Sequence, residues 1–211
     1  CVVPFTRGRE RSRDPQSILE EVHDLSHKGY KEITLLGQNV NSYGLKDKNE
    51  LSFGALLGRI NDIEGLKRIR FTTSHPQNCD AEMIDSMATY EKVCEHLHLP
   101  FQSGSNDILK KMERGYTSDE YLEKISMFYD KIPQGVLTSD VIVGFPGESD
   151  KDFEETLHLV RQSRFQSIYI FKYSPRPGTP AFGMDCLVDN KVIDERFEEL
   201  TRVQKQITKE N

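Results

Sequence analysis

Hydrophobic and polar positions along this chain repeat with two periods, one typical of helices and the other of buried strands. Residues 14–29 (DPQSILEEVHDLSHKG) predict a helix whose buried face consists of Ile18, Leu19, Val22 and Leu25. Asp14 is a suitable N-cap, Pro15 fits the first turn, and Gly29 fits the end of the helix. The next residues, 31–36 (KEITLL), predict a buried strand.

The same succession of strand and helix continues to the end of the chain. Further strands are predicted at residues 66–73, 93–100 and 165–173, and a strand with the loop that follows it at residues 135–147. Further helices are predicted at residues 51–62, 80–90, 105–115, 118–132, 149–163 and 189–211. The helix at 149–163 begins with a capping-box pair, Ser149 and Asp152. A strand–helix unit about every 30–40 residues indicates an α/β fold with parallel strands and outer helices, either open and doubly wound or a full or partial barrel.

Polar loops follow each predicted strand. They comprise residues 37–44 (GQNVNSYG), 74–78 (SHPQN), 101–107 (FQSGSND), 145–148 (FPGE) and 175–183 (PRPGTPAFG). Each is a good turn former by itself, but together at the strand C-termini they offer a ring of amides, hydroxyls and backbone N–H groups. Such a ring suits a polar, zwitterionic or nucleotide-like ligand. The usual dinucleotide and NTP phosphate loops have no support, because neither G-x-G-x-x-G after a strand nor G-x-x-x-x-G-K-[ST] is present.

Composition and charge restrict the class of protein further. The 211 residues include 36% hydrophobic and 29% charged residues, which are ordinary values for a globular protein with an ample core. A net charge of −6 argues against a bulk electrostatic hold on nucleic acid, although four alternating arginines near the start form a local basic stretch. No apolar run reaches the length of a membrane span, and no signal-peptide pattern is present. Four widely spaced cysteines fit reduced thiols in a cytoplasm better than secretion.

The inventory of acid–base groups is small. His75 is either a base or, more often in such loops, a hydrogen-bonding residue. His96 and His98 share one face of a strand, where two hydrogen-bonded side chains lining a barrel are favoured over a metal pair. Glu148 is interpreted as a charge at the start of a helix. A binding ring without Ser-His-Asp or Cys-His groups is typical of an enzyme whose cofactor supplies the chemistry.

Seven segments of the chain, in order, resemble the radical S-adenosylmethionine (SAM) methylthiotransferases. They are CVVPFTRGRERSR, LLGQNVNSYG, RFTTSHP, HLPFQSGS, MERGYT, DVIVGFPGE and YSPRPGTPA, and they span essentially the whole chain. The first is similar to the stretch that begins at the third cysteine of the family's C-x-x-x-C-x-x-C motif. GQNVNSYG and HLPFQSGS are most similar to the tRNA 2-methylthio-N6-isopentenyladenosine synthases, the MiaB family. The resemblance implies a partial (βα)6-type TIM-like barrel.

The resemblance also implies radical chemistry on tRNA. Three cysteines of the family hold a 4Fe–4S cluster that chelates SAM, and reductive cleavage gives a 5′-deoxyadenosyl radical that attacks C2 of a modified adenosine beside the anticodon. A second 4Fe–4S cluster in a preceding domain supplies sulfur, and a second SAM supplies the methyl group. The implied partners are the tRNA anticodon stem-loop and an electron donor such as flavodoxin or ferredoxin. The implied protein is a cytoplasmic monomer that does not bind membranes.

Three alternatives stay open. One is the same chemistry on a ribosomal protein or on threonylcarbamoyl-adenosine in tRNA, the second is a catalytically inactive RNA-binding barrel, and the third is a phosphate-sugar barrel enzyme. Of the three cluster cysteines only the third, Cys1, is present. We therefore expect residues 1–211 to be a central radical SAM domain, truncated at both ends and inactive without its auxiliary-cluster and RNA-binding domains. Cys79, Cys94 and Cys186 are interpreted as ordinary thiols, with Cys94 buried at the start of its strand.

The resemblance assigns residues to the cofactor and the substrate. Gln38 and Asn39 are expected beside the SAM amino group, since an amide oxygen accepts from an ammonium. Gln102 and Arg114 are expected at SAM, where the guanidinium binds the carboxylate; the alternative for Arg114 is a solvated helix residue. The other assignments are ribose for Ser103 and Asp140, adenine for Gly144, and substrate for Arg7, Arg9 and Arg176. For the basic stretch, which continues through Arg11 and Arg13, ion pairs with nearby acids are the alternative.

Overall fold

The computed structural model describes residues 6, 8, 11–45 and 51–211. The predictions for Cys1, Arg7 and Arg9 lie outside these residues. The chain divides into two compact units. The N-terminal unit contains the described residues of 10–98 together with residues 126–136, and the C-terminal unit is formed mainly by residues 99–125 and 137–211.

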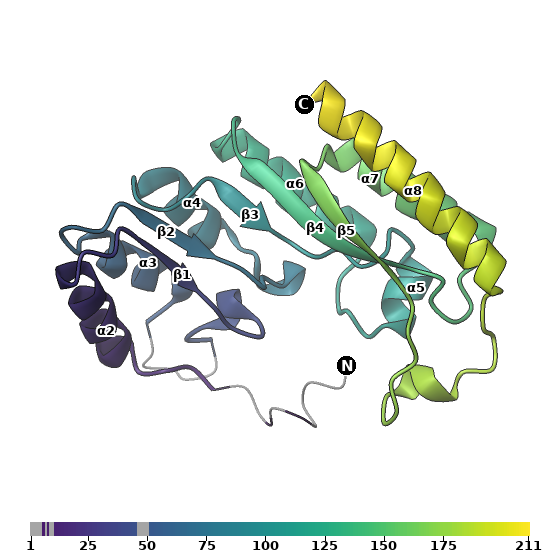
Figure 1. The fold of residues 1–211 in the computed structure, drawn as a ribbon, viewed down its shortest axis with the longest axis horizontal. Coiled ribbons are helices and arrows are strands. Elements are labelled where there is room, and N and C mark those ends of the chain that lie inside the picture. Colours follow the sequence, from purple (N-terminus) through teal and green to yellow (C-terminus); the bar gives the residue numbers. More distant parts are fainter. Residues whose placement is uncertain (1–5, 7, 9–10, 46–50) are drawn as a thin grey trace. The chain divides into compact units, whose positions relative to one another are not determined.

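Helices and strands alternate in the N-terminal unit (Figure 1). They are α2 (Pro15–His27), β1 (Glu32–Leu35), α3 (Phe53–Asn61), β2 (Arg68–Phe71), α4 (Ala81–Thr89) and β3 (His96–His98), with 3-10 turns at Val40–Ser42 and Pro76–Asn78. β1 and β2 pair in parallel, with Glu32 opposite Arg68. Asp14 caps α2 by accepting a hydrogen bond from the amide of Ser17, and Pro15 stands in the first turn, as predicted.

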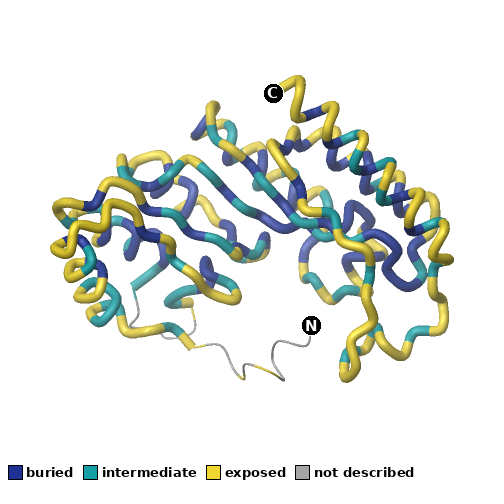
Figure 2. Tube along the Cα trace, viewed as in Figure 1, coloured by how far each residue is buried: buried dark blue, intermediate teal, exposed yellow. Residues whose placement is uncertain are grey.

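The apolar core of the N-terminal unit is formed largely by α3, β2 and α4. Its buried side chains include Leu56, Leu57, Ile60, Ile69, Phe71, Met83, Ile84 and Met87. Buried stretches of the chain are dark blue in Figure 2. Burying one such side chain is worth about 1.5–3 kcal/mol. The prediction of a fully buried first strand was wrong, because in β1 only Ile33 is buried and Glu32 on the other face pairs with Arg68 and Arg70.

The C-terminal unit repeats the pattern with longer elements. They are α5 (Asn106–Lys111), the start of α6 (Ser118–Lys131), β4 (Val136–Val143), α7 (Asp150–Ser163), β5 (Ser167–Lys172), a 3-10 turn (Pro180–Gly183) and α8 (Asn190–Glu210). β4 and β5 pair in parallel, with Asp140 opposite Tyr169. α8 packs on β5 and α7. The rings of Phe101, Tyr121 and Phe165 pack against one another in the core of this unit.

The alternation along β4 separates its two faces. Leu137, Ser139, Val141 and Val143 are buried, whereas Thr138, Asp140 and Ile142 on the other face are half-buried. Asp140 therefore lies on the more accessible face of β4. The prediction that Cys94 is buried at the start of its strand was wrong, because Cys94 is half-buried and precedes β3. Cys79 is a fully buried free thiol. None of the helices in the described ranges is long and apolar enough to cross a membrane.

Candidate functional site

The turn after β4 is shaped by Gly144 and Glu148. Gly144 has φ +75°, in the left-handed region that favours glycine. Its amide donates to Glu148 Oε2 at 2.7 Å, which closes the turn. A Cβ at this position would lie 2.4 Å from Cγ1 of Ile193 on α8. Glycine is therefore required here both by the backbone conformation and by the neighbouring helix.

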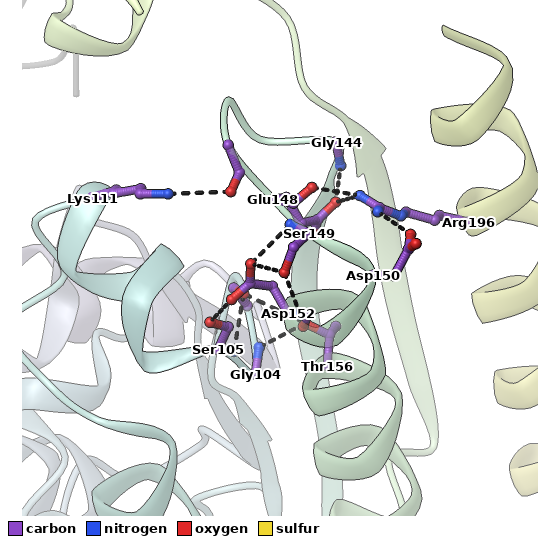
Figure 3. A network of polar contacts seen from close by, with 12 residues as sticks. Gly104, Ser105, Lys111, Gly144, Glu148, Ser149, Asp150, Asp152, Thr156 and Arg196 are labelled. Carbon is purple, nitrogen blue, oxygen red and sulfur yellow. Dashed lines mark hydrogen bonds and ion pairs between the residues drawn. The ribbon is translucent and has the colours of Figure 1, made fainter. Parts of the chain in front are cut away.

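Glu148 is a buried ion-pair residue rather than a simple charge at a helix start. Its side chain is inaccessible and pairs with Arg196 Nη1 at 2.7 Å, and the same nitrogen donates to the Glu148 carbonyl at 3.1 Å (Figure 3). Arg196 Nη2 reaches Asp150 Oδ1 at 2.8 Å. Burial raises the pKa of the Glu148 carboxyl, while the Gly144 amide and the Arg196 guanidinium act in the opposite direction.

The loop after β3 is held on β4 through the backbone of Gln102. The Gln102 amide donates to the Asp140 carbonyl at 2.9 Å, and the Ile142 amide donates to the Gln102 carbonyl at 2.9 Å. Gln102 adopts φ +67°, an uncommon conformation for a residue other than glycine. This bridge pairs Gln102 with Val141, the residue that follows Asp140 on β4.

Arg114 lies just beyond the end of α5 and leans on Tyr116. Its Nε is 3.4 Å from the Tyr116 hydroxyl, and its Cζ is 5.7 Å from the centre of that ring. The Tyr116 hydroxyl donates to the carbonyl of Phe101 at 2.9 Å, and burial raises its pKa, so it stays protonated. Arg114 is half-buried, unlike a solvated helix arginine. Through Tyr116 it is connected to Phe101, the residue before Gln102.

Ser103 does not face the accessible side of the loop. It is fully buried, its Oγ accepts from the Ser105 amide at 3.2 Å, and it lies 3.4 Å from Thr156 Oγ1 on α7. The Gly104 amide also donates to Thr156 Oγ1, at 2.9 Å. Ser105 Oγ in turn bonds Asp152, which forms the predicted capping box with Ser149 at the start of α7 (Figure 3). These contacts give Ser103 a structural role and do not support the predicted contact with ribose.

In the N-terminal unit, Asn39 and Gln38 stand in the loop after β1. Asn39 Nδ2 donates to Asn78 Oδ1 at 2.7 Å, while Asn39 Oδ1 is a buried acceptor without a partner among the described residues. Gln38 is exposed, and both residues line a cavity of about 380 Å³ beside α2 and β1. The unpartnered oxygen is the kind of acceptor that a ligand ammonium requires.

A reciprocal pair joins the two loops of this unit. Asn41 Nδ2 donates to the His75 carbonyl at 3.0 Å, and the His75 amide donates back to Asn41 Oδ1 at 2.8 Å. His75 Nδ1 accepts from the Gln77 amide at 3.3 Å, so this side chain caps a 3-10 turn. These bonds favour the hydrogen-bonding interpretation of His75 over the role of a base.

The remaining predicted residues are dispersed. Arg176 is exposed in the loop after β5. Arg13 pairs with Glu21, as the ion-pair alternative for the basic stretch expected. His96 and His98 are half-buried on β3, and burial lowers the pKa of His96. Within the described ranges, no three His, Cys, Asp or Glu side chains are grouped as metal ligands.

Sequence reasoning missed two features of the C-terminal unit. Arg196 was not singled out, because nothing in the helical pattern of α8 indicates a partner 48 residues away. Tyr169 and Phe171 were assigned to a strand, but they are 60% and 51% exposed, on the same face of β5 as their neighbours Asp140 and Ile142 on β4. Two exposed aromatic rings beside a carboxylate are suited to holding a planar ligand.

Comparison with known proteins gives concordant results. A curated protein from Thermoanaerobacter sp. (strain X514) is 55% identical over the whole chain, and one from Alkaliphilus oremlandii is 54% identical over 95% of it. Both are named tRNA-2-methylthio-N(6)-dimethylallyladenosine synthase. The chain spans 45% and 42% of the length of these relatives, somewhat less than half.

Solved structures with low sequence identity share the fold. The radical SAM methyltransferase TsrM from Kitasatospora setae aligns over 83% of this chain and 34% of its own, with a TM-score of 0.66 and 16% identity. Coproporphyrinogen III oxidase (HemN) from Escherichia coli aligns over 92% of this chain and 46% of its own, with a TM-score of 0.65 and 14% identity. The predicted α/β partial barrel is thereby confirmed. The family model described as "Radical SAM superfamily" matches residues 1–160, and this chain belongs to that superfamily.

Proposed function

We propose that the protein containing this chain is a tRNA methylthiotransferase that modifies C2 of N6-isopentenyladenosine next to the anticodon. The observation that carries the proposal is the identity of 51–55% to curated relatives that bear the corresponding name, over essentially the whole chain. The same chemistry on a ribosomal protein is less favoured, because the similar proteins named above are tRNA-modifying enzymes.

The residues of the C-terminal unit suit SAM by their own chemistry. Arg114 is half-buried, and its two terminal nitrogens make no hydrogen bond to another described residue, so they are available for a carboxylate. Asp140, on the more accessible face of β4, is proposed to accept from the ribose hydroxyls, and Gln102 in the neighbouring loop offers an amide to SAM. Gly144 is buried in the tight turn at the end of β4 and is proposed to lie next to the adenine. In the N-terminal unit, the unpartnered Asn39 Oδ1 is proposed to accept from the ammonium, next to Gln38.

Cys1 is proposed as one ligand of the 4Fe–4S cluster, with two further cysteines preceding it in the complete protein. When bound, the cluster and SAM supply one-electron chemistry that ordinary side chains lack. A second 4Fe–4S cluster in a preceding domain, an electron donor of the flavodoxin or ferredoxin type, a monomeric state and a cytoplasmic location belong to the same proposal. Residues 1–211 are then the radical SAM domain and are inactive alone.

Aromatic and basic side chains of the C-terminal unit are proposed to meet the substrate. Tyr169 and Phe171 present exposed rings on β5, and aromatic side chains stack on unpaired RNA bases. Arg176 in the following exposed loop suits an RNA phosphate, and Arg7 and Arg9 are proposed for the same role.

The proposal is tested in the complete, cluster-reconstituted protein. Arg114→Ala should weaken SAM binding about 10- to 100-fold, the range for losing a charge-assisted hydrogen bond. Arg202→Ala is the matched control, because this arginine is 78% exposed on α8 and pairs only loosely with Glu199. Mass spectrometry of tRNA incubated with the wild-type protein should detect the methylthio group. Unchanged SAM affinity would remove Arg114 from the site, and modification of a ribosomal protein in place of tRNA would refute the substrate.

A further inference from the structure

We propose that Arg196 on α8 is a positioning residue that sets the geometry of the Gly144–Glu148 turn for the adenosine part of SAM. The inference rests on the proposed function, which places Gly144 beside adenine. It adds a residue that the sequence motifs do not include and that need not touch the cofactor itself.

The first observation is that one face of α8 contacts the turn twice. Ile193 occupies the space that a Cβ on Gly144 would need, with its Cγ1 at 2.4 Å from that position. Arg196 follows three residues later, and residues three apart lie on the same side of a helix. α8 therefore limits the space at the turn through Ile193 and also presents a cation to it. Figure 3 shows Arg196 reaching Glu148 from α8.

The second observation is a continuous chain of hydrogen bonds from Arg196 to the Gly144 backbone. Arg196 Nη1 donates to the Glu148 carboxylate at 2.7 Å and to the Glu148 carbonyl at 3.1 Å. The same carboxylate oxygen accepts from the Gly144 amide at 2.7 Å. Because the guanidinium fixes this oxygen, it also fixes the direction of the Gly144 amide.

The third observation is burial. The side chain of Arg196 is 7% exposed and that of Glu148 is inaccessible, whereas Lys172–Asp194, an ion pair between β5 and α8, is about half exposed on both sides. Removing one partner of a buried pair leaves an uncompensated charge, so the turn has to rearrange when Arg196 is lost. The Arg196 guanidinium also lies 5.5 Å from the Phe153 ring, which holds it over the start of α7.

The alternative explanation is that Arg196 has a purely structural role and only attaches α8 to the start of α7. Loss of a purely structural residue lowers stability but leaves the affinity of the folded protein for adenosine unchanged. A positioning residue affects both, and its effect on affinity follows the hydrogen bonds to the turn. The two explanations are therefore separable by measuring binding and stability on the same variants.

The experiment uses the complete protein, with S-adenosylhomocysteine and SAM as probes. The variants are Arg196→Met, which keeps the apolar stem, Arg196→Lys, which keeps the charge but not the fork, and Glu148→Gln. Arg202→Met on the exposed side of α8 is the control. Calorimetry gives the dissociation constants, thermal unfolding gives stability, and hydrogen exchange reports protection of the peptide that contains Gly144.

We expect Arg196→Met to raise both dissociation constants at least tenfold and to speed exchange at Gly144, with Arg196→Lys in between and the control unchanged. A folded Arg196→Met protein with affinities within twofold of the wild type would overturn the positioning role, even with a lower melting temperature. If Arg196→Met does not fold, Arg196→Lys decides in the same way, since it keeps the charge but loses the planar guanidinium that binds the turn, and unchanged affinities would overturn the positioning role. Failure of the wild type to bind SAM would instead refute the proposed function, and the inference with it.

Discussion

Replacing Gly144 with alanine would place a methyl group inside the space of the Ile193 side chain. The new Cβ would lie 2.4 Å from Cγ1, 2.6 Å from Cδ1 and 3.2 Å from Cγ2 of Ile193. A left-handed conformation costs a residue with a Cβ about 1–2 kcal/mol, and overpacking adds about 1–3 kcal/mol. We therefore expect Gly144→Ala to lower the free energy of unfolding by about 2–5 kcal/mol, a large part of the stability of a typical domain.

Two further substitutions separate the backbone contribution from the steric one. Gly178→Ala should cost only about 1–2 kcal/mol, because φ there is +83° but nothing lies within 4 Å of the added Cβ. In the background of Ile193→Ala, which removes all three contacting atoms, Gly144→Ala should cost about the same as Gly178→Ala. Urea unfolding of the four proteins in the cycle measures the coupling between Gly144 and Ile193. A coupling below about 0.5 kcal/mol would refute the steric argument.

Three other predictions concern the same unit. Gly104→Ala should destabilise by at least about 3 kcal/mol, because its Cβ would lie 2.5 Å from backbone atoms of α7 that cannot rotate away, and thermal unfolding measures this. Burial raises the pKa of the Asp152 carboxyl, but the hydrogen bonds from Ser105 and Ser149 lower this pKa by more, so the folded-state pKa lies below the ordinary value. The stability that this carboxylate contributes is therefore present above about pH 4 and is lost as pH falls through the folded-state pKa. Between pH 7 and pH 2 the melting temperature of Asp152→Asn should accordingly fall less than that of the wild type. An equal fall in both proteins would contradict this. Phe171→Ala should change stability by less than about 1 kcal/mol, since the ring is half exposed, and should weaken binding of an anticodon stem-loop RNA; unchanged RNA affinity would remove this ring from the substrate site.

The local features of this fold could be predicted from the sequence, because they depend on neighbouring residues. The cap at Asp14 and the capping box of Ser149 and Asp152 were both found from residue types three or fewer positions apart. Which face of a strand is buried depends on the layers that cover it. Ile33 and Phe171 were therefore both assigned to strands, but only Ile33 is buried.

The loops of the candidate site could be predicted from the sequence, but the contacts that their side chains make with distant helices could not. The motifs located Gln102 and Gly144, because both stand in recognisable turns after strands. They did not predict the partner of Glu148, since Arg196 lies 48 residues away on a helix with many other charges. They also did not predict that Ser103 faces α7, because adjacent residues in a loop can point to opposite sides.

The left-handed backbone of Gln102 has a consequence for engineering this protein. Glycine would relieve about 1–2 kcal/mol of backbone strain at this position and cost about 0.5–1 kcal/mol in chain entropy, so it would be as stable or better. The conformation is imposed from outside, by the two hydrogen bonds that β4 makes to the Gln102 amide and carbonyl. A search for stabilising substitutions would therefore select glycine here and would discard the Gln102 side chain, which is proposed to bind SAM. Stability and activity of this loop have to be optimised separately, with position 102 held constant.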